Sequence, residues 1–407
     1  MPARLAILGA GPIGLEAGLY AKQLKLPFTI YEQGRVGEHV WRWGHVRLFS
    51  PFGMNATALG RLAIRTATPG HEFPADDACI SGREHVERYL KPLADGMRDS
   101  IRPETRVVNV GRVGLFKQDS PGDAGRGKQP FLLLIRERNQ DRFEEADIIL
   151  DCTGTYTHHR WLGPGGLPAL GETQAEPHIA YGLVDALGDA KRDYINKSIL
   201  VVGSGYSAAT TVCNLAKLGA EHNTTWVTWI ARTSGTAPLR RIPNDPLRER
   251  DRLAVTANTL ATRSDDNVEF RANTYVESIE TNNNFQTLRV ALRTGLDRKT
   301  LEVDKIIANV GYTPDRAIYR ELQIHECYAS FGPMKLAVAL ASSAGQDCLK
   351  QVCRGPESLR NPEPNFYILG AKSYGRNSHF LMRLGFEQVR DVFTLITGNA
   401  KLDLYKN

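Results

Sequence analysis

The 407-residue sequence predicts an α/β protein with two Rossmann-like domains of the three-layer ββα type, the first of them discontinuous along the chain. Two observations predict this class. A glycine-rich turn joins an apolar strand to a helix at Gly9 and again at Gly203, and the same order of strands follows each turn. This repetition predicts two copies of one architecture. The chain is long enough for two or three separate cores, so each copy can have its own.

The first copy begins at the N-terminus. It has the strand RLAILGA, the turn Gly9-Ala10-Gly11-Pro12-Ile13-Gly14, a helix to about Leu24 and the strand PFTIYE, which ends at Glu32. The second copy has the strand SILVVGS, the turn Gly203-Ser204-Gly205-Tyr206-Ser207-Ala208, a helix to about Leu218 and the strand TWVTWIAR, which ends at Arg232. Each is a β-α-β unit, the context in which a GxGxxG/A motif indicates dinucleotide binding.

The two copies also continue alike. Residues 105–154 and 267–311 alternate between polar and apolar side chains and have polar tips, which predicts short antiparallel strands. Each stretch ends in one apolar strand, DIILDCTG or KIIANVG, that returns to the sheet carrying its own glycine turn. We assign residues 1–175 and 305–407 to the first dinucleotide-binding domain and 176–304 to the second.

The composition, 42% hydrophobic and 24% charged with a net charge of +6, is that of an ordinary globular protein. The basic residues are scattered, so we expect no nucleic-acid partner. The sequence enters directly into an apolar strand and has no apolar run that could span a bilayer, so we expect a cytoplasmic protein without a membrane partner.

The six cysteines form no CxxC pair and the histidines show no metal-ligand spacing. A homodimer is left open.

The glycines of each turn have separate roles. The first allows a tight turn, the second lets the backbone approach a pyrophosphate, and the third (Gly14 or Ala208) lets the helix pack closely on the strand. The pyrophosphate then lies at the helix N-terminus, where free N–H groups and the helix dipole favour negative charge.

The residue that ends the next strand indicates which nucleotide is bound. The carboxylate of Glu32 can accept hydrogen bonds from an adenosine ribose and would repel a 2′-phosphate, which suits FAD or NAD. At the equivalent place Arg232 suits the 2′-phosphate of NADPH, with Arg240 or Arg241 as helpers. We therefore expect FAD at the first turn and NADPH at the second, so that hydride passes from nicotinamide to flavin.

These residues resemble the flavoproteins with two dinucleotide-binding domains, which include thioredoxin reductases and flavin-containing monooxygenases. The resemblance spans nearly the whole chain. It rests on both glycine turns with Glu32 and Arg232, and on the segments DCTGTY (151–156), NVGYTPD (309–315) and FYILGAKSYGRNS (366–378). It implies that Thr153 and Gly154 contact FAD.

The resemblance is closer to the monooxygenase branch. Disulfide reductases of this family carry CxxC in the nucleotide domain or C-x4-C after the first β-α-β unit, and neither stretch contains cysteine here. VGEHVW with Asn55, and the late element Gln388-Val389-Arg390, are similar to the monooxygenases, which implies that Trp41 and Asn55 lie near the flavin. The F-x-G-x-x-x-H fingerprint of that branch is degenerate, and the C-terminal Gly-Asp of many members reads Gly370-Ala371, with Gly370 at the cofactor.

Two further segments complete the expected site. Residues 378–397 predict an amphipathic helix that Asn377 or Ser378 caps, and in the resembled fold its N-terminus points at the flavin. The segment HVWRWGHVRLFSPF predicts an aromatic pocket wall that excludes water. His45, Arg47 and Asn55 are the candidates there for proton transfer or substrate orientation, with core packing as the alternative for each.

The sequence thus predicts an FAD-dependent oxidoreductase that reduces FAD with NADPH and activates O2 to oxygenate a small organic substrate. One alternative is a dithiol-free, NAD(P)H-dependent flavin reductase or dehydrogenase of the thioredoxin-reductase type. Another is a non-catalytic flavoprotein that senses NADP. We identify no catalytic acid or base, because the flavin itself carries the chemistry.

Overall fold

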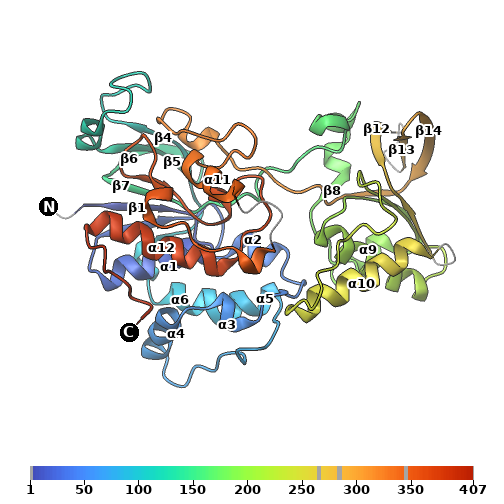
Figure 1. Ribbon diagram of the computed structural model, residues 1–407, viewed down its shortest axis with the longest axis horizontal. Coiled ribbons are helices and arrows are strands. Elements are labelled where there is room, and N and C mark those ends of the chain that lie inside the picture. The colour runs from blue at the N-terminus through green and yellow to red at the C-terminus, as the bar shows by residue number, and fades with distance from the viewer. Residues whose placement is uncertain (1–2, 264–266, 282–286, 343–346, 407) are drawn as a thin grey trace. The chain divides into compact units, whose positions relative to one another are not determined.

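The computed structural model describes residues 3–263, 267–281, 287–342 and 347–406. The chain divides into two compact units, which are described separately below; Figure 1 labels many of their elements. Unit 1 consists of Met1–His158 and Thr313–Asn407, and unit 2 consists of His159–Tyr312. Within the described ranges, no helix combines the length and the apolar character needed to cross a bilayer.

Unit 1 contains a five-stranded parallel sheet in the order β16-β7-β1-β2-β3. Its strands are β1 (Leu5–Leu8), β2 (Phe28–Tyr31), β3 (Ile101–Arg102), β7 (Ile148–Asp151) and β16 (Phe366–Ile368). A separate antiparallel sheet contains β4 (Thr105–Arg112), β5 (Phe131–Glu137) and β6 (Gln140–Ala146). Alternate side chains of β1 serve two cores: Leu5 and Ile7 pack with the helices, and Ala6 and Leu8 pack with the antiparallel sheet. The parallel sheet is therefore the middle layer, as the predicted ββα class requires.

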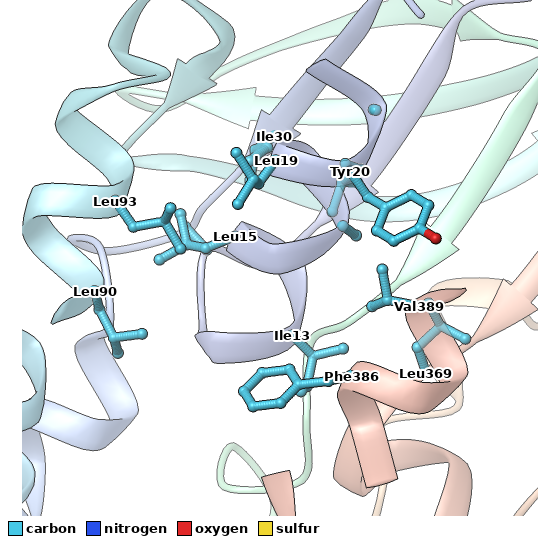
Figure 2. Close-up of a cluster of buried hydrophobic side chains, with 14 of the residues drawn as sticks. Ile13, Leu15, Leu19, Tyr20, Ile30, Leu90, Leu93, Leu369, Phe386 and Val389 are labelled. Atoms are coloured by element: carbon cyan, nitrogen blue, oxygen red, sulfur yellow. The ribbon is translucent and has the colours of Figure 1, made fainter. Parts of the chain in front are cut away.

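Helices α1 (Pro12–Gln23) and α12 (Met382–Thr397) pack together in the first of these cores, as Figure 2 shows. Ile13 lies beside Phe386, while Leu15 faces Leu93 from another helix. A Cβ at Gly385 would overlap the side chain of Ile13, so this glycine permits the close approach of the two helices. The other helices of unit 1 are α2 (Glu38–Arg42), α3 (Phe52–Asn55), α4 (Ala58–Ala67), α5 (Gly82–His85), α6 (Lys91–Asp95) and α11 (Met334–Ala341).

Unit 2 repeats this arrangement with the parallel order β11-β10-β9-β15-β8. Its strands are β8 (Ile179–Tyr181), β9 (Ser198–Val202), β10 (Trp226–Ile230), β11 (Val268–Arg271) and β15 (Lys305–Ala308), with an antiparallel sheet of β12 (Thr274–Thr281), β13 (Leu288–Thr294) and β14 (Asp297–Val303). Its helices are α7 (Glu172–Ala175), α8 (Lys191–Tyr194), α9 (Tyr206–Glu221) and α10 (Arg248–Thr262). Ile199 and Val201 pack with the helices, whereas Leu200 and Val202 pack with the antiparallel sheet.

The unit boundaries differ from the predicted domain boundaries. Residues 159–175 and 305–312 lie in unit 2, although the sequence assigned both segments to the first domain. The reason is packing: β15 pairs with β9 in the parallel sheet of unit 2, and Leu162 and Ala169 are buried in a core of the same unit. The return of KIIANVG to the sheet of its own glycine turn, which the sequence also predicts, is confirmed.

A buried ion-pair network anchors the loop between β4 and β5. Arg112 Nε donates to Glu363 Oε1 at 2.8 Å, and Arg126 Nη2 donates to Glu363 Oε2 at 3.0 Å. All three side chains are fully buried. Glu363 precedes β16, so the network lies at the amino end of that strand.

Candidate functional site

The first glycine turn lies between β1 and α1. Gly9 has a φ of +97°, and a Cβ there would lie 2.9 Å from the carbonyl oxygen of Cys152. A Cβ at Gly14 would overlap the carbonyl oxygen of Gly9, so this glycine lets the helix close on the strand. At Gly11 a Cβ would meet no protein atom within 4 Å, and α1 begins with Pro12 and without a side-chain cap. The N–H groups of the first turn of α1 can therefore receive an anionic group beside Gly11.

Glu32 follows β2 directly and is buried beside this turn. Its Oε2 accepts the N–H of Ala10 at 2.8 Å, and its Oε1 accepts the N–H of Gly34 at 2.8 Å. Burial raises the pKa of Glu32, although the two backbone hydrogen bonds oppose the rise. Each carboxylate oxygen has a second lone pair, so Glu32 can also accept hydrogen bonds from ribose hydroxyls.

A second turn, residues 151–154, follows β7 and lies against the first glycine turn. A Cβ at Gly9 would lie 3.3 Å from the Cα of Thr153. Asp151 Oδ1 accepts the N–H of Thr153 at 3.1 Å and its hydroxyl at 2.7 Å. Lys372 Nζ donates to Asp151 Oδ2 at 2.6 Å and to Thr153 Oγ1 at 2.9 Å. Gly154 completes the turn with a φ of +70°. The structure thus brings Thr153 to the glycine turn, and its contact with FAD stays a prediction.

Gly370 lies in the turn after β16 and reaches the start of α1. Its φ is +69°, and a Cβ there would lie 3.1 Å from Cγ1 of Ile13. Its N–H donates to Gln388 Oε1 at 2.8 Å, and Gln388 Nε2 donates to the hydroxyl of Ser373 at 2.9 Å. The glutamine of the predicted Gln-x-Arg element therefore fixes the turn that carries Gly370.

The predicted cap of the last helix is wrong. Helix α12 begins at Met382, and its cap position is Leu381, which makes no side-chain cap. The helix starts late because the backbone of Leu381 is extended, with φ −121° and ψ 146°. Asn377 Oδ1 instead accepts the N–H of His379 at 3.0 Å, so Asn377 stabilises a turn before the helix.

The aromatic segment contacts other elements of unit 1. Trp41 lies in α2, where the Arg35 guanidinium lies 4.6 Å and the Arg83 guanidinium 5.4 Å from its ring. His39 of the same helix lies 5.8 Å from the ring of Tyr156, which places α2 near the 151–156 segment. Trp41 is therefore on an element that reaches the first site.

The three candidates for proton transfer lie between α2 and the end of α3. Asn55 is buried; its Nδ2 donates to the carbonyl of Ser50 at 3.0 Å and its Oδ1 accepts the Ser50 hydroxyl at 2.9 Å. Its amide therefore holds the start of α3. Arg47 Nη1 donates to the carbonyl of Cys79 at 3.0 Å, and His45 is partly buried. A catalytic role for these residues stays a prediction.

The second glycine turn lies between β9 and α9 and has the same construction. Gly203 has a φ of +141°, and a Cβ there would overlap the carbonyl oxygen of Asn309, just as Gly9 abuts Cys152. A Cβ at Gly205 would meet no protein atom within 4 Å. Ala208 is fully buried, and the buried Trp229 donates from Nε1 to the carbonyl of Gly203 at 2.7 Å. Tyr206 and Ser207 form the first turn of α9.

The side chains near the end of β10 differ in how they are held. Arg232 is exposed and, among the described residues, its guanidinium makes no hydrogen bond or ion pair; the same holds for Arg240. Arg241 is held by Asp251 through two hydrogen bonds of 2.9 Å. Within the described part of the chain, the buried Asn309 Oδ1 lacks a hydrogen-bond partner beside the second turn. Arg232 and Arg240 are thus available to an anionic ligand, whereas Arg241 is already paired with Asp251.

Sequence reasoning missed the pairing of Asp151 with Lys372. Both residues stand inside quoted segments, DCTGTY and FYILGAKSYGRNS, but the two are separated by 221 positions. A lysine after a glycine turn carries no sequence signal of burial. Only the adjacency of β7 and β16 brings the two side chains together.

Comparisons with known proteins agree with this construction. Two family models, both described as pyridine nucleotide-disulphide oxidoreductase, match residues 6–117 and 153–327. A curated relative, the uncharacterized oxidoreductase CzcO of Bacillus velezensis, is 20% identical over 213 residues, which cover 52% of this chain and 51% of the relative. The match therefore spans about half the length of that relative.

Solved structures match over nearly the whole chain. The bacillithiol disulfide reductase Bdr (YpdA) from Bacillus cereus has a TM-score of 0.70 and 15% identity, covering 98% of this chain and 99% of the other. DfoA, the FAD-bound cadaverine monooxygenase of the desferrioxamine pathway from Erwinia amylovora, has a TM-score of 0.65 and 14% identity, covering 99% and 96%. At these identities the likeness shows the fold, and it is shared by reductases and monooxygenases.

Proposed function

Because the chain belongs to the pyridine nucleotide-disulphide oxidoreductase family and has two dinucleotide-binding domains, we propose that it is an FAD enzyme that oxidises NADPH. The observation that carries the proposal is the pair of glycine turns, built alike but followed by side chains of opposite charge. Glu32 is buried and bound to its turn, whereas Arg232 is exposed and has no ionic partner among the described residues.

The residues at the first turn fit FAD. No protein atom lies within 4 Å of a Cβ placed at Gly11, so a pyrophosphate can approach the backbone there. The first turn of α1 supplies N–H groups at this point. Glu32 would hold the adenosine ribose through its remaining lone pairs. When bound, the flavin supplies the capacity to take a hydride and to pass electrons to an acceptor. The residues of this chain would bind and orient it.

The residues at the second turn fit NADPH. Gly205 leaves the same kind of approach as Gly11, at the start of α9. Arg232 and Arg240 would hold the 2′-phosphate, because guanidinium groups match phosphate oxygens in charge and geometry. Arg241 is already bound to Asp251 and would contribute less.

We further propose that the electrons go to O2 and that a small organic molecule is oxygenated. Support comes from the cysteines, since disulfide reduction requires an attacking thiolate beside the flavin. In the described part of the chain the six cysteines form no disulfide with one another. Cys152, which lies against the first glycine turn, has a pKa raised well above its usual value by burial, so it is a poor nucleophile.

The test begins with the visible spectrum of the purified protein. We expect an oxidised-flavin band that anaerobic NADPH bleaches faster than NADH does. In Arg232→Ala this preference for NADPH should fall, whereas Arg192→Ala, an exposed arginine of the same unit, should keep it. Equal losses with both nucleotides would overturn the assignment of the 2′-phosphate to Arg232.

The fate of the electrons is measured after air is admitted. Label from 18O2 in an organic product would support the monooxygenase. Reoxidation that is fast with quinones, and that yields no labelled product across a panel of small amines, ketones and sulfides, would support the reductase instead. A protein that binds FAD but is not reduced by either nucleotide would be the non-catalytic flavoprotein.

A further inference from the structure

We propose that Asp151 and Lys372 are positioning residues that hold Thr153 against the first glycine turn and thereby set the affinity for FAD. This inference rests on the proposed FAD site. The three side chains form one closed network at the carboxyl ends of the neighbouring strands β7 and β16, where Asp151 is the register partner of Ile368.

The polar groups of Asp151, Thr153 and Lys372 bond to one another. The ammonium of Lys372 donates to Asp151 at 2.6 Å and to Thr153 at 2.9 Å, and lies 5.0 Å from the ring centre of Tyr319. Asp151 Oδ1 takes both the N–H and the hydroxyl of Thr153. The side chains of Asp151 and Lys372 are 0% exposed. Thr153 is therefore fixed through its backbone and its side chain at once.

The position of Thr153 matters because of its neighbour. A Cβ at Gly9 would lie 2.9 Å from the oxygen of Cys152 and 3.3 Å from the Cα of Thr153, so the two turns touch without spare room. If the 151–154 turn moves, the backbone of Gly9 moves with it, and the space at Gly11 changes. A network that fixes Thr153 therefore fixes the cradle for a pyrophosphate.

A purely stabilising role is the competing explanation. A buried ion pair by itself is weak evidence for stability, because two apolar side chains of the same size often do as well. The positioning role requires the hydrogen bonds to Thr153, which apolar side chains of the same size cannot make. The two explanations separate in variants that keep the fold and remove those bonds.

The experiment measures the FAD dissociation constant of the apoprotein by flavin fluorescence, and its thermal midpoint. Thr153→Val removes the hydroxyl and keeps the ion pair, and Thr153→Ser restores the hydroxyl. We expect Thr153→Val to raise the dissociation constant about tenfold and Thr153→Ser to restore it. Lys372→Met and the double variant Asp151→Leu with Lys372→Met, which removes every side-chain hydrogen bond to Thr153, should also weaken FAD binding, even where the double variant regains its thermal midpoint.

Glu363→Gln is the matched control, because it breaks another fully buried ion pair of unit 1 at the other end of β16. It should lower the thermal midpoint without weakening FAD binding of the folded protein. If Thr153→Val binds FAD as the wild type does, or if the double variant regains both properties together, the positioning role is overturned while the FAD site stands. If the wild type itself binds no FAD, the proposed function and this inference fall together.

Discussion

The hydroxyl of Thr57 donates a hydrogen bond of 2.9 Å to a carboxylate oxygen of Glu16, whose side chain is fully buried in unit 1. Glu16 lies in α1, two residues after Gly14. Burial raises the pKa of Glu16 from 4.5 to about 7, because the charged form loses its water. Near neutral pH this carboxyl changes its charge inside the core.

The stability of the protein should therefore decrease with pH through Glu16. The folded pKa is higher than the unfolded one, so the contribution is complete below pH 4.5 and is lost as the pH rises to about 7. Each pH unit in this window lowers the free energy of unfolding by about 1.4 kcal/mol. Glu16→Gln has no carboxyl at this position and should not show this loss. Relative to the wild type, its free energy of unfolding should therefore rise by up to about 3 kcal/mol between pH 4.5 and pH 8. Urea unfolding of both proteins at a series of pH values measures this difference. Parallel plots of unfolding free energy against pH would contradict the prediction.

Two glycines of the first turn should respond differently to alanine. A Cβ at Gly14 overlaps the carbonyl oxygen of Gly9, so Gly14→Ala should destabilise the apoprotein by about 1–3 kcal/mol. A Cβ at Gly11 meets no protein atom within 4 Å, so Gly11→Ala should leave the urea midpoint nearly unchanged and weaken FAD binding. Urea unfolding and flavin fluorescence check both. Full FAD affinity in Gly11→Ala would place the pyrophosphate elsewhere.

Glu32→Gln should weaken the first turn. The amide has one acceptor oxygen, so either the N–H of Ala10 or that of Gly34 loses its partner, at a cost of about 1–3 kcal/mol. Glu38→Gln is the control, because Glu38 pairs with Arg35 and Arg42 near the surface, where such pairs contribute about 0–1 kcal/mol. Urea midpoints of the apoproteins should separate the two variants. Equal midpoints would mean that the Glu32 hydrogen bonds contribute little.

The cysteines should differ in their reaction with iodoacetamide near pH 7.5. Hydrogen bonds from Ser330 lower the pKa of Cys327, which lies near the surface, whereas burial raises that of Cys152. Mass spectrometry of timed samples should find Cys327 modified first, and Ser330→Ala should slow it. Equal labelling of Cys152 would remove the argument that its thiol is a poor nucleophile.

The sequence predicted most of the fold because its signals are local. The apolar run at Leu5–Leu8 and the spacing of glycines from Gly9 to Gly14 depend on neighbours within one turn or strand. The ββα class and both β-α-β units are therefore confirmed by the order of the strands. Glu32 was also found from its place at a strand end, and its hydrogen bonds to the turn show why that place matters.

The remaining features depend on backbone geometry and side-chain contacts that the apolar pattern and the motifs do not report. The start of α12 is set by the extended backbone at Leu381, which the apolar pattern of 378–397 does not reveal. The sequence left Asn55 as a residue near the flavin or as a core residue, and it did not show that the amide bonds to Ser50. The pair Asp151–Lys372 depends on which strands are neighbours, and no spacing rule reports that.

The way in which unit 2 interrupts unit 1 has a consequence for biosynthesis. Asp151 leaves the ribosome 221 residues before Lys372, and all of unit 2 is made in between. At about 5–20 residues per second this is a delay of about 10–40 s. During that time β7 is the edge of its sheet, because β16 has not yet been made. Such an edge can pair with other chains. Nascent unit 1 is therefore the part of this protein that a chaperone would have to protect, and unit 2, which is contiguous, is the part that can fold first.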